Sequence, residues 1–269
     1  MPTKDDILTS KIFFNAVLPL VKVIATDIDS LSKKFKQTHA VVQVSALSPD
    51  APEGKVATHF VINSGEWLVH TSKVTKKPHI ELEFKSIEAF NAFFKGKISP
   101  STLPKMRGIT KKPGTFIAFM QVLLKMSSLL STKKPPEDHE TKKLLVKCFF
   151  YLLSSGISQL NKNEHDAIHD WAKKSPDRVY AWAVDGYPEV SSYLRTKAGK
   201  SKAGRGEYKR AMPFFTLRFN SLDSALGILL SIDDMLEATK AGRLIMDGAP
   251  EFGAQIGEYM LTVSGYAQG

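Results

Sequence analysis

The alternation of apolar and polar positions predicts the same series of elements twice along this chain. Residues 80–84 alternate as a strand does, and the stretch that follows carries apolar residues at helical spacing. Residues 215–219 and the stretch after them repeat this order. In each copy we expect a strand, an amphipathic helix, a second short helix and a strand marked by glycine. A proline then opens a closing helix with a broad apolar face.

Two anchors relate the copies to each other. Phe84 and Phe219 lie 135 residues apart, in the segments FKSIE and FNSLD, and Pro113 and Pro250 lie 137 residues apart. At the second spacing the polar positions of the closing helices also coincide: Gln121 with Glu258 and Lys125 with Thr262. We interpret the chain as two copies of one module, residues 1–134 and 135–269, joined by the polar, double-proline linker Ser131–Asp138.

Helices and strands also fill the rest of each half. The first half is expected to form a helix at 5–36 broken by Pro19, and strands at 40–46, 56–62 and 66–69 with a hairpin turn at Asn63-Ser64-Gly65. Ser86 is expected to cap the amphipathic helix that follows the strand 80–84, and the closing helix is expected from 115 to about 130. The second half is expected to form a helix at 140–160, an inserted helix at 164–173 capped by Asn163, strands at 179–184, 190–194 and 214–219, and a mobile basic loop at 196–209. These elements predict an α+β fold, with a curved sheet covered by helices in each half.

Charge is distributed unevenly over a composition typical of a globular protein. The 269 residues are 43% hydrophobic and carry a net charge of +10. Residues 1–135 hold 20 Lys and Arg against 10 Asp and Glu, whereas the remainder holds 17 of each. Such asymmetry favours an anionic partner for the first half, either a membrane surface or a nucleic acid. The stretch 196–209 is basic too, but Tyr208 is its one aromatic residue and no recognised nucleic-acid module surrounds it, so we expect no nucleic acid.

The sequence gives no convincing targeting or membrane-spanning segment. Asp5 and Asp6 stand where a signal peptide would be basic, and the apolar run 12–21 contains Asn15 and Pro19 and is too short to span a bilayer. With Cys148 as the single cysteine, no internal disulfide is possible. We expect a cytoplasmic protein.

The closing helices have wider apolar arcs than contact with one sheet needs. In the first, Gln121, Lys125 and Ser128 form a narrow polar stripe. We therefore predict an apolar, ligand-binding cavity lined by Phe90, Phe93, Phe94, Met106, Phe116, Phe119, Met120, Leu123 and Leu124 in the first half, and by Leu226, Leu230, Ile256, Tyr259 and Met260 in the second. The second set of residues has less aromatic surface than the first. We therefore expect a ligand to fill the cavity of the second half less readily than that of the first. The alternative is that all these residues simply pack a core.

Short segments of both halves share a pattern of apolar residues and glycines: EFKSIEAF (83–90), FKGK (94–97) and LPKMRG (103–108), and again LRFNSLD (217–223) and DGAP (247–250). These segments give the chain a resemblance to the sterol carrier protein type 2 family of lipid-transfer proteins. It covers most of both halves, through soft patterns of apolar residues and glycines. It implies a sheet backed by helices around an apolar tunnel that holds a fatty acyl chain, a sterol or another lipid. The familiar members are single modules, so two modules in tandem are a departure from the family.

Basic residues lie close to the first closing helix. Lys105, Arg107, Lys111 and Lys112 could dock on anionic headgroups or hold a lipid carboxylate or phosphate at the cavity mouth. The alternative is a solvated loop.

Signals of catalysis or metal binding are weak. His165 and His169 share one helical face, but no third ligand is evident and a solvated, salt-bridged face accounts for them. Gly199-Lys200-Ser201 lacks the glycine that a phosphate loop needs five residues earlier. Cys148 lies in an apolar helix, where an inert thiol is expected.

These patterns predict a protein, not an enzyme, that binds and transfers lipids without a cofactor or metal. Its two modules are expected to act as a pseudo-dimer, with transient contact to anionic membranes. Two alternatives remain open. One is a regulatory interaction module with closed cavities, and the other is an enzyme acting on an acyl or sterol substrate.

Overall fold

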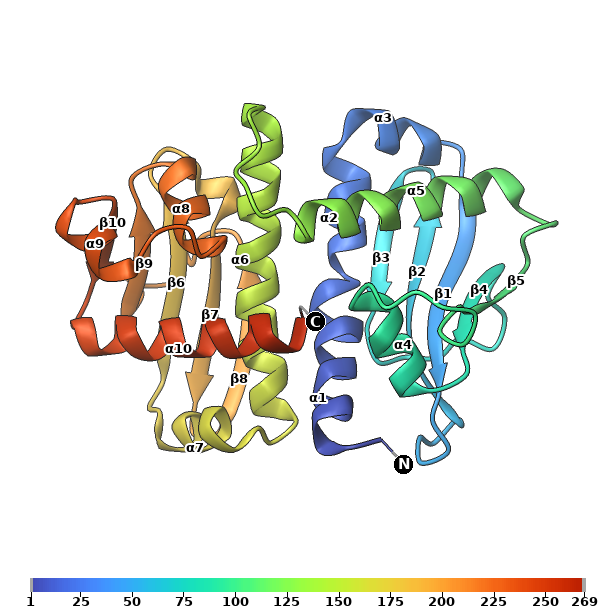
Figure 1. Cartoon of the computed structure of the whole chain (residues 1–269), viewed down its shortest axis with the longest axis horizontal. Coiled ribbons are helices and arrows are strands. Elements are labelled where there is room, and N and C mark those ends of the chain that lie inside the picture. Colours follow the sequence, from blue (N-terminus) through green and yellow to red (C-terminus); the bar gives the residue numbers. More distant parts are fainter. Residues whose placement is uncertain (1, 268–269) are drawn as a thin grey trace. The chain divides into compact units, whose positions relative to one another are not determined.

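The computed structural model describes residues 2–267 and divides the chain into two compact units. The first holds the residues up to Ser128 and those from Tyr266 onward, and the second holds Leu129–Gly265. Each contains a five-stranded mixed sheet packed with helices (Figure 1), so the predicted α+β class is confirmed. The module boundary that we place after residue 134 stays a prediction.

The elements follow the order expected from the sequence, with a few differences. The first series is α1 (Lys4–Ile12), a π-helical turn (Phe13–Val17), α2 (Leu20–Asp27), α3 (Asp29–Ser32), a 3-10 turn (Lys33–Phe35), β1 (His39–Leu47), β2 (Lys55–Asn63), β3 (Glu66–His70), β4 (Ile80–Phe84), α4 (Ile87–Phe94), β5 (Lys105–Arg107) and α5 (Pro113–Leu130). The second is α6 (His139–Lys162), α7 (Asp166–Lys174), β6 (Arg178–Val184), a 3-10 turn (Pro188–Val190), β7 (Ser192–Lys197), β8 (Lys200–Arg205), β9 (Phe215–Phe219), α8 (Leu222–Leu229), α9 (Met235–Lys240), β10 (Leu244–Asp247) and α10 (Pro250–Ala267).

The two sheets share one topology. The first has the strand order β3-β2-β1-β4-β5, and the second, taken from the corresponding edge, has β8-β7-β6-β9-β10. In each, the central pair is parallel and its neighbours are antiparallel. Ala46 lies opposite Phe84 in the first central pair, and Val184 lies opposite Phe219 in the second. The anchor phenylalanines found in the sequence therefore occupy the same place in the two sheets.

The step from strand to helix is also built alike in the two units. Ser86 and Ser221 are both extended, and their side chains accept hydrogen bonds from the backbone N–H groups of Ala89 and Ser224. These caps satisfy one of the free N–H groups at each helix start, and the predicted cap at Ser86 is confirmed. The closing helices α5 and α10 each begin at the aligned proline and span 18 residues.

The opening helix is broken where proline predicts it. Pro19 stands as the residue before α2, and the preceding turn is wound as a π-helix. Proline lacks the N–H group that would continue the helical ladder, so the axis is interrupted there.

Two equivalent hairpins differ in how well the sequence predicts them. Ser64 (φ 51°) and Gly65 (φ 85°) turn β2 into β3, as expected from the Asn63-Ser64-Gly65 signal. Ala198 (φ 44°) and Gly199 (φ 82°) likewise turn β7 into β8, so the expected mobile loop at 196–209 is wrong. β8 lacks the apolar alternation that predicts a strand. It forms because backbone pairing to β7 and contacts with α6 hold it.

Three smaller expectations are also wrong. Asn163 does not start α7: α6 runs on to Lys162, and the Asn163 amide donates to the Gln159 carbonyl at 2.8 Å, closing that helix instead. The expected strand at 190–194 begins only at Ser192. In the first unit, residues 95–104 form turns rather than a second short helix. The Thr102 hydroxyl donates to the Lys97 carbonyl at 2.9 Å and accepts from the Ser99 N–H at 2.9 Å, which stabilises a turn there.

Two helical stretches are long and apolar enough to cross a membrane by length and composition alone. They are Lys4–Asp27, whose most apolar window is 78% buried, and Pro113–Leu130, whose window is 33% buried. A buried helix of a folded domain passes the same test, so length and composition do not by themselves assign a membrane span. The low burial of α5 does mark an unusually apolar exposed helix.

Candidate ligand-binding site

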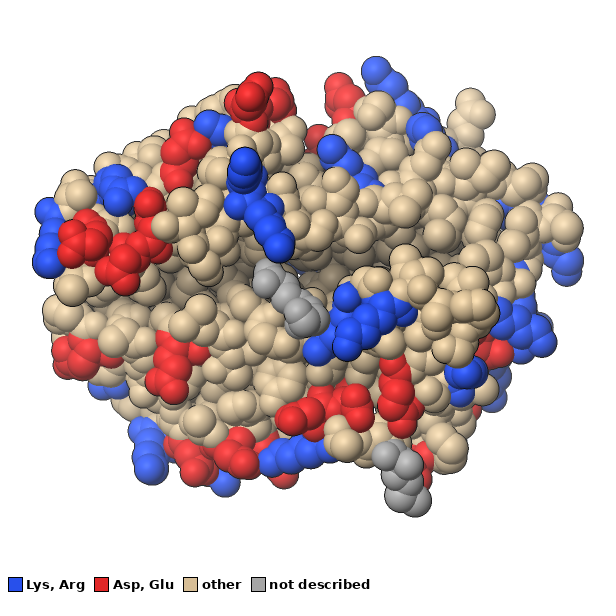
Figure 2. Space-filling model, in the orientation of Figure 1, with Lys and Arg blue, Asp and Glu red and all other residues tan. Residues whose placement is uncertain are grey.

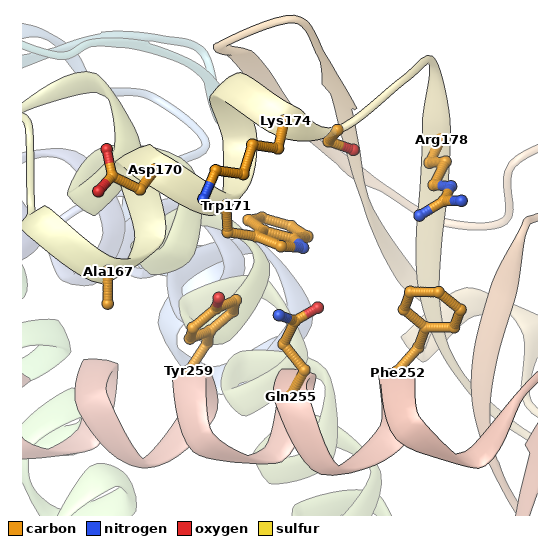
Figure 3. A pocket seen from close by; sticks show the side chains of 9 residues that line it. Ala167, Asp170, Trp171, Lys174, Arg178, Phe252, Gln255 and Tyr259 are labelled. Carbon is orange, nitrogen blue, oxygen red and sulfur yellow. The ribbon is translucent and has the colours of Figure 1, made fainter.

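A pocket of about 360 Å³ lies between α7, the start of β6 and α10 (Figure 3). Its size is at the lower end of the range typical of small-molecule sites. The residues that line it are Ala167, Asp170, Trp171, Lys174, Ser175, Arg178, Phe252, Gln255 and Tyr259. All of them belong to the second unit, and three come from the closing helix.

The alternation of β6 places its side chains under α10. Arg178, Tyr180 and Trp182 share one face of the strand, because successive strand residues point to opposite faces. The Trp182 indole N–H donates to the Met260 sulfur at 3.3 Å, which fixes α10 over this face. Arg178 is the first residue of β6, so its side chain lies at the open end of the covered row.

Helix α7 brings the third wall of the pocket. Its apolar residues Ile168 and Ala172 are fully buried, and this anchors the helix against the rest of the unit. Trp171 stands beside them and is half-buried. The helix corresponds to nothing in the repeated segments of the sequence, so Trp171 belongs to the second copy alone.

Three aromatic residues, Trp171, Phe252 and Tyr259, line the pocket. The Trp171 ring centroid lies 5.1 Å from that of Tyr259 and 5.3 Å from that of Tyr180. On the other side, Phe252 and Phe214 meet edge to face at 4.8 Å. Figure 3 shows Trp171 facing Tyr259 and Gln255 across the hollow. Rings locked against one another in this way give a rigid apolar surface.

Two cations border the pocket without a carboxylate partner. The guanidinium carbon of Arg178 lies 3.9 Å from the Phe214 ring centroid and 5.1 Å from that of Phe252, a cation–π arrangement. Across residues 2–267, neither Arg178 nor Lys174 makes an ion pair. The one lining carboxylate, Asp170, lies 4.0 Å from Lys173, outside the pocket. The lining therefore has an excess of positive charge.

Two buried phenols lie at the back of this arrangement. Burial raises the pKa of Tyr259 to about 12, the nearby Glu258 charge adds to the effect, and a hydrogen bond from Gln255 opposes it. The Tyr180 side chain is 1% exposed, and its hydroxyl has no hydrogen-bond partner in the described part of the chain. Buried polar groups usually find a partner, so this hydroxyl marks a place where a polar group belongs.

The predicted residues of the first unit are dispersed between core and surface. Phe90 stacks on Phe14 at 4.0 Å and is fully buried, in a cluster that also takes in Phe93 and Phe94. Phe119 is fully buried and Leu123 is 8% exposed, whereas Phe116 and Met120 are half-buried. Met106 is 40% exposed and Leu124 is 66% exposed. Their part in binding a ligand stays a prediction.

In the second unit the structure brings one of the five predicted residues to the pocket. Tyr259 lines it, while Met260 holds the Trp182 N–H behind it. Leu226 and Ile256 are buried and Leu230 is half-buried, and none of the three lines this pocket.

Sequence reasoning missed the groups that give the pocket its character: Trp171, Lys174, Arg178 and Phe252. The inserted helix was a usable signal for Trp171, because an element added to one copy of a repeat often serves that copy's own function. Arg178 and Phe252 gave no comparable signal, since only the tertiary fold brings the start of β6 next to the start of α10.

The basic residues predicted to meet headgroups have varied surroundings. A guanidinium nitrogen of Arg107 lies 2.7 Å from the Glu83 carboxylate, and the Lys112 ammonium donates to the His39 carbonyl at 3.1 Å. Lys105 and Lys111 are exposed. Arg107 is therefore engaged by an ion pair and Lys112 by a hydrogen bond, whereas Lys105 and Lys111 remain open to solvent or to a partner.

A buried pair of acids in the first unit is the strongest rival for an active site. Glu81 is 4% exposed and Glu83 is 9% exposed, and they lie two residues apart on one face of β4. The Lys55 ammonium bridges them at 2.7 Å and 3.0 Å. Glu81 also accepts from Gln43 and Ser45, each at 2.8 Å. With the acids fully engaged by donors, the arrangement resembles a structural network more than a reactive carboxylate.

The second unit supports this interpretation by inverting the charges. Arg218 occupies the position of Glu83 in the parallel register, opposite Ala183. Its guanidinium lies 2.8 Å from Asp247 and 3.1 Å from Asp185. In the second unit an arginine stands where the first has a glutamate, and its partners are acids instead of a lysine and an arginine. The two units therefore share ion pairing at this position but not a carboxylate that could act as an acid or base.

The remaining candidates give no sign of chemistry. His169 lies with its Nδ1 atom 3.0 Å from the Asn161 amide oxygen, and Cys148 is fully buried. Among the described residues, no group of three His, Cys, Asp or Glu side chains is placed to hold a metal ion.

Comparison with known proteins gives weak similarities. No family model matches the chain, and no curated protein matches it. A conserved hypothetical protein from Thermus thermophilus, described as a candidate sterol carrier protein, is similar in structure over 44% of this chain and 87% of its own, at 21% identity and a TM-score of 0.30. The inverting sec-alkylsulfatase Pisa1 from Pseudomonas sp. is similar over 57% of this chain and 28% of its own, at 13% identity and a TM-score of 0.25. Similarity at this level carries no argument about function.

Proposed function

We propose that this protein binds and transfers lipid-like molecules without catalysing a reaction, and that the pocket beside α10 is a working binding site. The observation that supports the proposal most strongly is a hollow beneath the closing helix that is lined by the aromatic rings of Trp171, Tyr259 and Phe252. The resemblance of the sequence segments to the sterol carrier protein type 2 family points to the same class of ligand.

Burial of an apolar chain can supply the binding energy. Transfer of one methylene from water is worth about 0.8 kcal/mol, so about ten methylenes give on the order of 8 kcal/mol before the costs of association. Because rigid aromatic walls are already in place, little further ordering of the site is needed.

Release is proposed to occur at an anionic membrane, in the cytoplasm. The equivalent positions Leu124 on α5 and Leu261 on α10 are 66% and 67% exposed. Taking each unit by itself, uncharged residues predominate over its closing helix in the view of Figure 2. Lys105, Lys111 and Lys112 lie before α5, and each basic residue near such a surface adds about 1 kcal/mol of attraction.

Native mass spectrometry of the purified protein, followed by organic extraction, tests the carrier function directly. A co-purified lipid at one or two molecules per chain would support it and count the occupied sites. Absence of lipid, together with no displacement of a fluorescent fatty acid, would instead support the regulatory interaction module.

A binding assay then locates the site. Trp171 is half-buried, whereas Trp67 and Trp182 are buried, so a ligand in the pocket should change mainly the emission of Trp171. We expect the ligand-induced change to vanish in Trp171→Phe and the affinity to fall in Phe252→Ala. Leu261→Ala, on the exposed side of the same helix, is the matched control and should bind normally.

A further inference from the structure

The pocket beside α10 combines aromatic walls with positive charge, and this combination selects a ligand class. Resting on the proposed function, we infer that this pocket takes a single-chain amphiphile with an anionic head group, which Arg178 and Lys174 bind while its apolar part packs between Trp171 and Phe252.

The state of Arg178 is the first reason. Its guanidinium is held over the Phe214 and Phe252 rings, at 3.9 Å and 5.1 Å from their centroids, and is not neutralised by a carboxylate within the described chain. Three other arginines of this unit form ion pairs: Arg195 with Asp177 at 2.6 Å, Arg218 with Asp247 at 2.8 Å, and Arg243 with Asp233. A half-buried, immobilised and unpaired guanidinium keeps its hydrogen-bond donors for an outside acceptor.

The polar groups around the hollow are the second reason. Lys174 also lacks an ion pair among residues 2–267, and the lining acid Asp170 lies near Lys173. Tyr180, on the same strand face as Arg178, buries a hydroxyl without a partner, and its ring lies 5.3 Å from Trp171. Tyr259 is a neutral phenol at neutral pH, and burial raises its pKa further, so it contributes no competing negative charge.

The difference between the two units is the third reason. In the shared sheet register, the first unit carries Ala40 and Val42 where the second carries Arg178 and Tyr180. Val122 of α5 stands where α10 has Tyr259, at the spacing of the aligned prolines. The cations and phenols are therefore additions made in the second copy, which packing a common fold does not require.

The size of the pocket limits the ligand. At about 360 Å³ it suits one chain or ring system rather than the two chains of a phospholipid. The shared chemistry is an anionic head on one apolar tail, and the head could be a carboxylate or a phosphate monoester.

A matched set of ligands tests the inference. Dodecanoate, dodecyl phosphate, dodecanol and dodecylamine, each below its micellar concentration, compete with a fluorescent fatty acid on the full-length protein. We expect both anions to bind at least tenfold more tightly than the alcohol, and the amine to bind worst. A charge-assisted hydrogen bond is typically strong enough for such a difference. Equal affinities of the two anions would show that charge is recognised, whereas a large difference would identify the preferred head.

Variants assign the effect to the two cations. Arg178→Gln and Lys174→Gln should each weaken dodecanoate binding, with about a tenfold loss for Arg178→Gln, and leave dodecanol unchanged. Arg178→Lys should retain part of the preference, which a purely structural role in the aromatic cluster would not explain. Arg195→Gln and Lys240→Gln, whose cations pair with Asp177 and Glu237 and do not line the pocket, are the matched controls and should behave as the unaltered protein.

The failures of the inference and of the proposed function are distinguishable. Equal binding of alcohol and acid, or an unchanged acid preference in Arg178→Gln, would overturn the inference while leaving a lipid-binding pocket. If none of the four ligands displaces the probe or changes the Trp171 emission, the proposed function of this pocket fails together with the inference.

Discussion

Replacement of Glu81 by leucine should destabilise the first unit strongly without affecting the pocket of the second. Glu81 is 4% exposed and accepts hydrogen bonds from Gln43, Ser45 and Lys55 at 2.7–2.8 Å. Leucine has a similar size but cannot accept any of them. Glu81→Leu therefore tests whether this buried cluster stabilises the fold, as its inverted counterpart around Arg218 suggests.

The expected loss follows from the groups that are left without a partner. Gln43 and Ser45 are fully buried, and an unsatisfied buried donor costs about 1–3 kcal/mol. Lys55 is partly solvated and still has Glu83 at 3.0 Å, so it adds less. We expect a total of about 4 kcal/mol, within the usual range for breaking a buried ionic network.

The result also depends on pH, with a sign that can be worked out. Burial acts to raise the pKa of Glu81, but the hydrogen bonds from Lys55, Gln43 and Ser45 outweigh it and lower this pKa below its ordinary 4.5. A folded-state pKa below the unfolded one gives stability that is present above pH 4.5 and is lost as pH falls. The difference between Glu81→Leu and the unaltered protein should therefore shrink in acid.

Urea unfolding followed by circular dichroism measures the loss, with hydrogen exchange of peptides from β1 and β4 to assign it to the first unit. A loss of about 4 kcal/mol corresponds to a midpoint lower by roughly 2 M urea. Glu66→Leu, at an exposed position of β3, is the control and should change little. A loss below about 1 kcal/mol for Glu81→Leu would refute the reasoning, because it would mean that the network contributes almost nothing.

Two further predictions concern the second unit. Burial raises the pKa of Tyr259 to about 12, so the free energy of unfolding should fall by up to about 3 kcal/mol as pH rises from 10 to 12. Tyr259→Phe should abolish that part of the alkaline loss of stability. An unchanged dependence of stability on pH in the variant would contradict the prediction. A Cβ at Gly156 would come within 2.4 Å of the Val263 side chain, so Gly156→Ala should cost about 1–3 kcal/mol of stability by overpacking α6 against α10. The double variant with Val263→Ala should recover part of this loss in thermal unfolding, and a single variant as stable as the unaltered protein would show that the helices can separate.

Local signals in the sequence were sufficient for most elements. Ser86 caps its helix as predicted, and the closing helix begins at Pro113, two residues before the predicted start at 115, since a cap and a first-turn proline act within a few residues. Pro19 interrupts the opening helix for an equally local reason. The spacing between Phe84 and Phe219 indicated that the two halves share one arrangement of elements. A strand followed directly by a capped helix recurs at both places, and the two phenylalanines occupy the same position in the two sheets.

Expectations failed where distant residues supply the stabilising contacts. β8 is polar in sequence and forms because β7 offers backbone partners and Asn161 of α6 donates to the Gly199 carbonyl at 3.0 Å. Asn163 lies near two helix ends, and only the observed length of α6 shows which of them it closes.

The candidate site shows the same division more clearly. By itself the sequence determined that the closing helices are apolar over a wide arc and that one copy has an extra helix, because both are properties of nearby residues. Only the tertiary structure decided that Trp171, Arg178 and Phe252 surround one pocket, since they come from three elements that meet through packing. It also decided which cations are unpaired, because an ion pair depends on distances in space that sequence spacing does not contain.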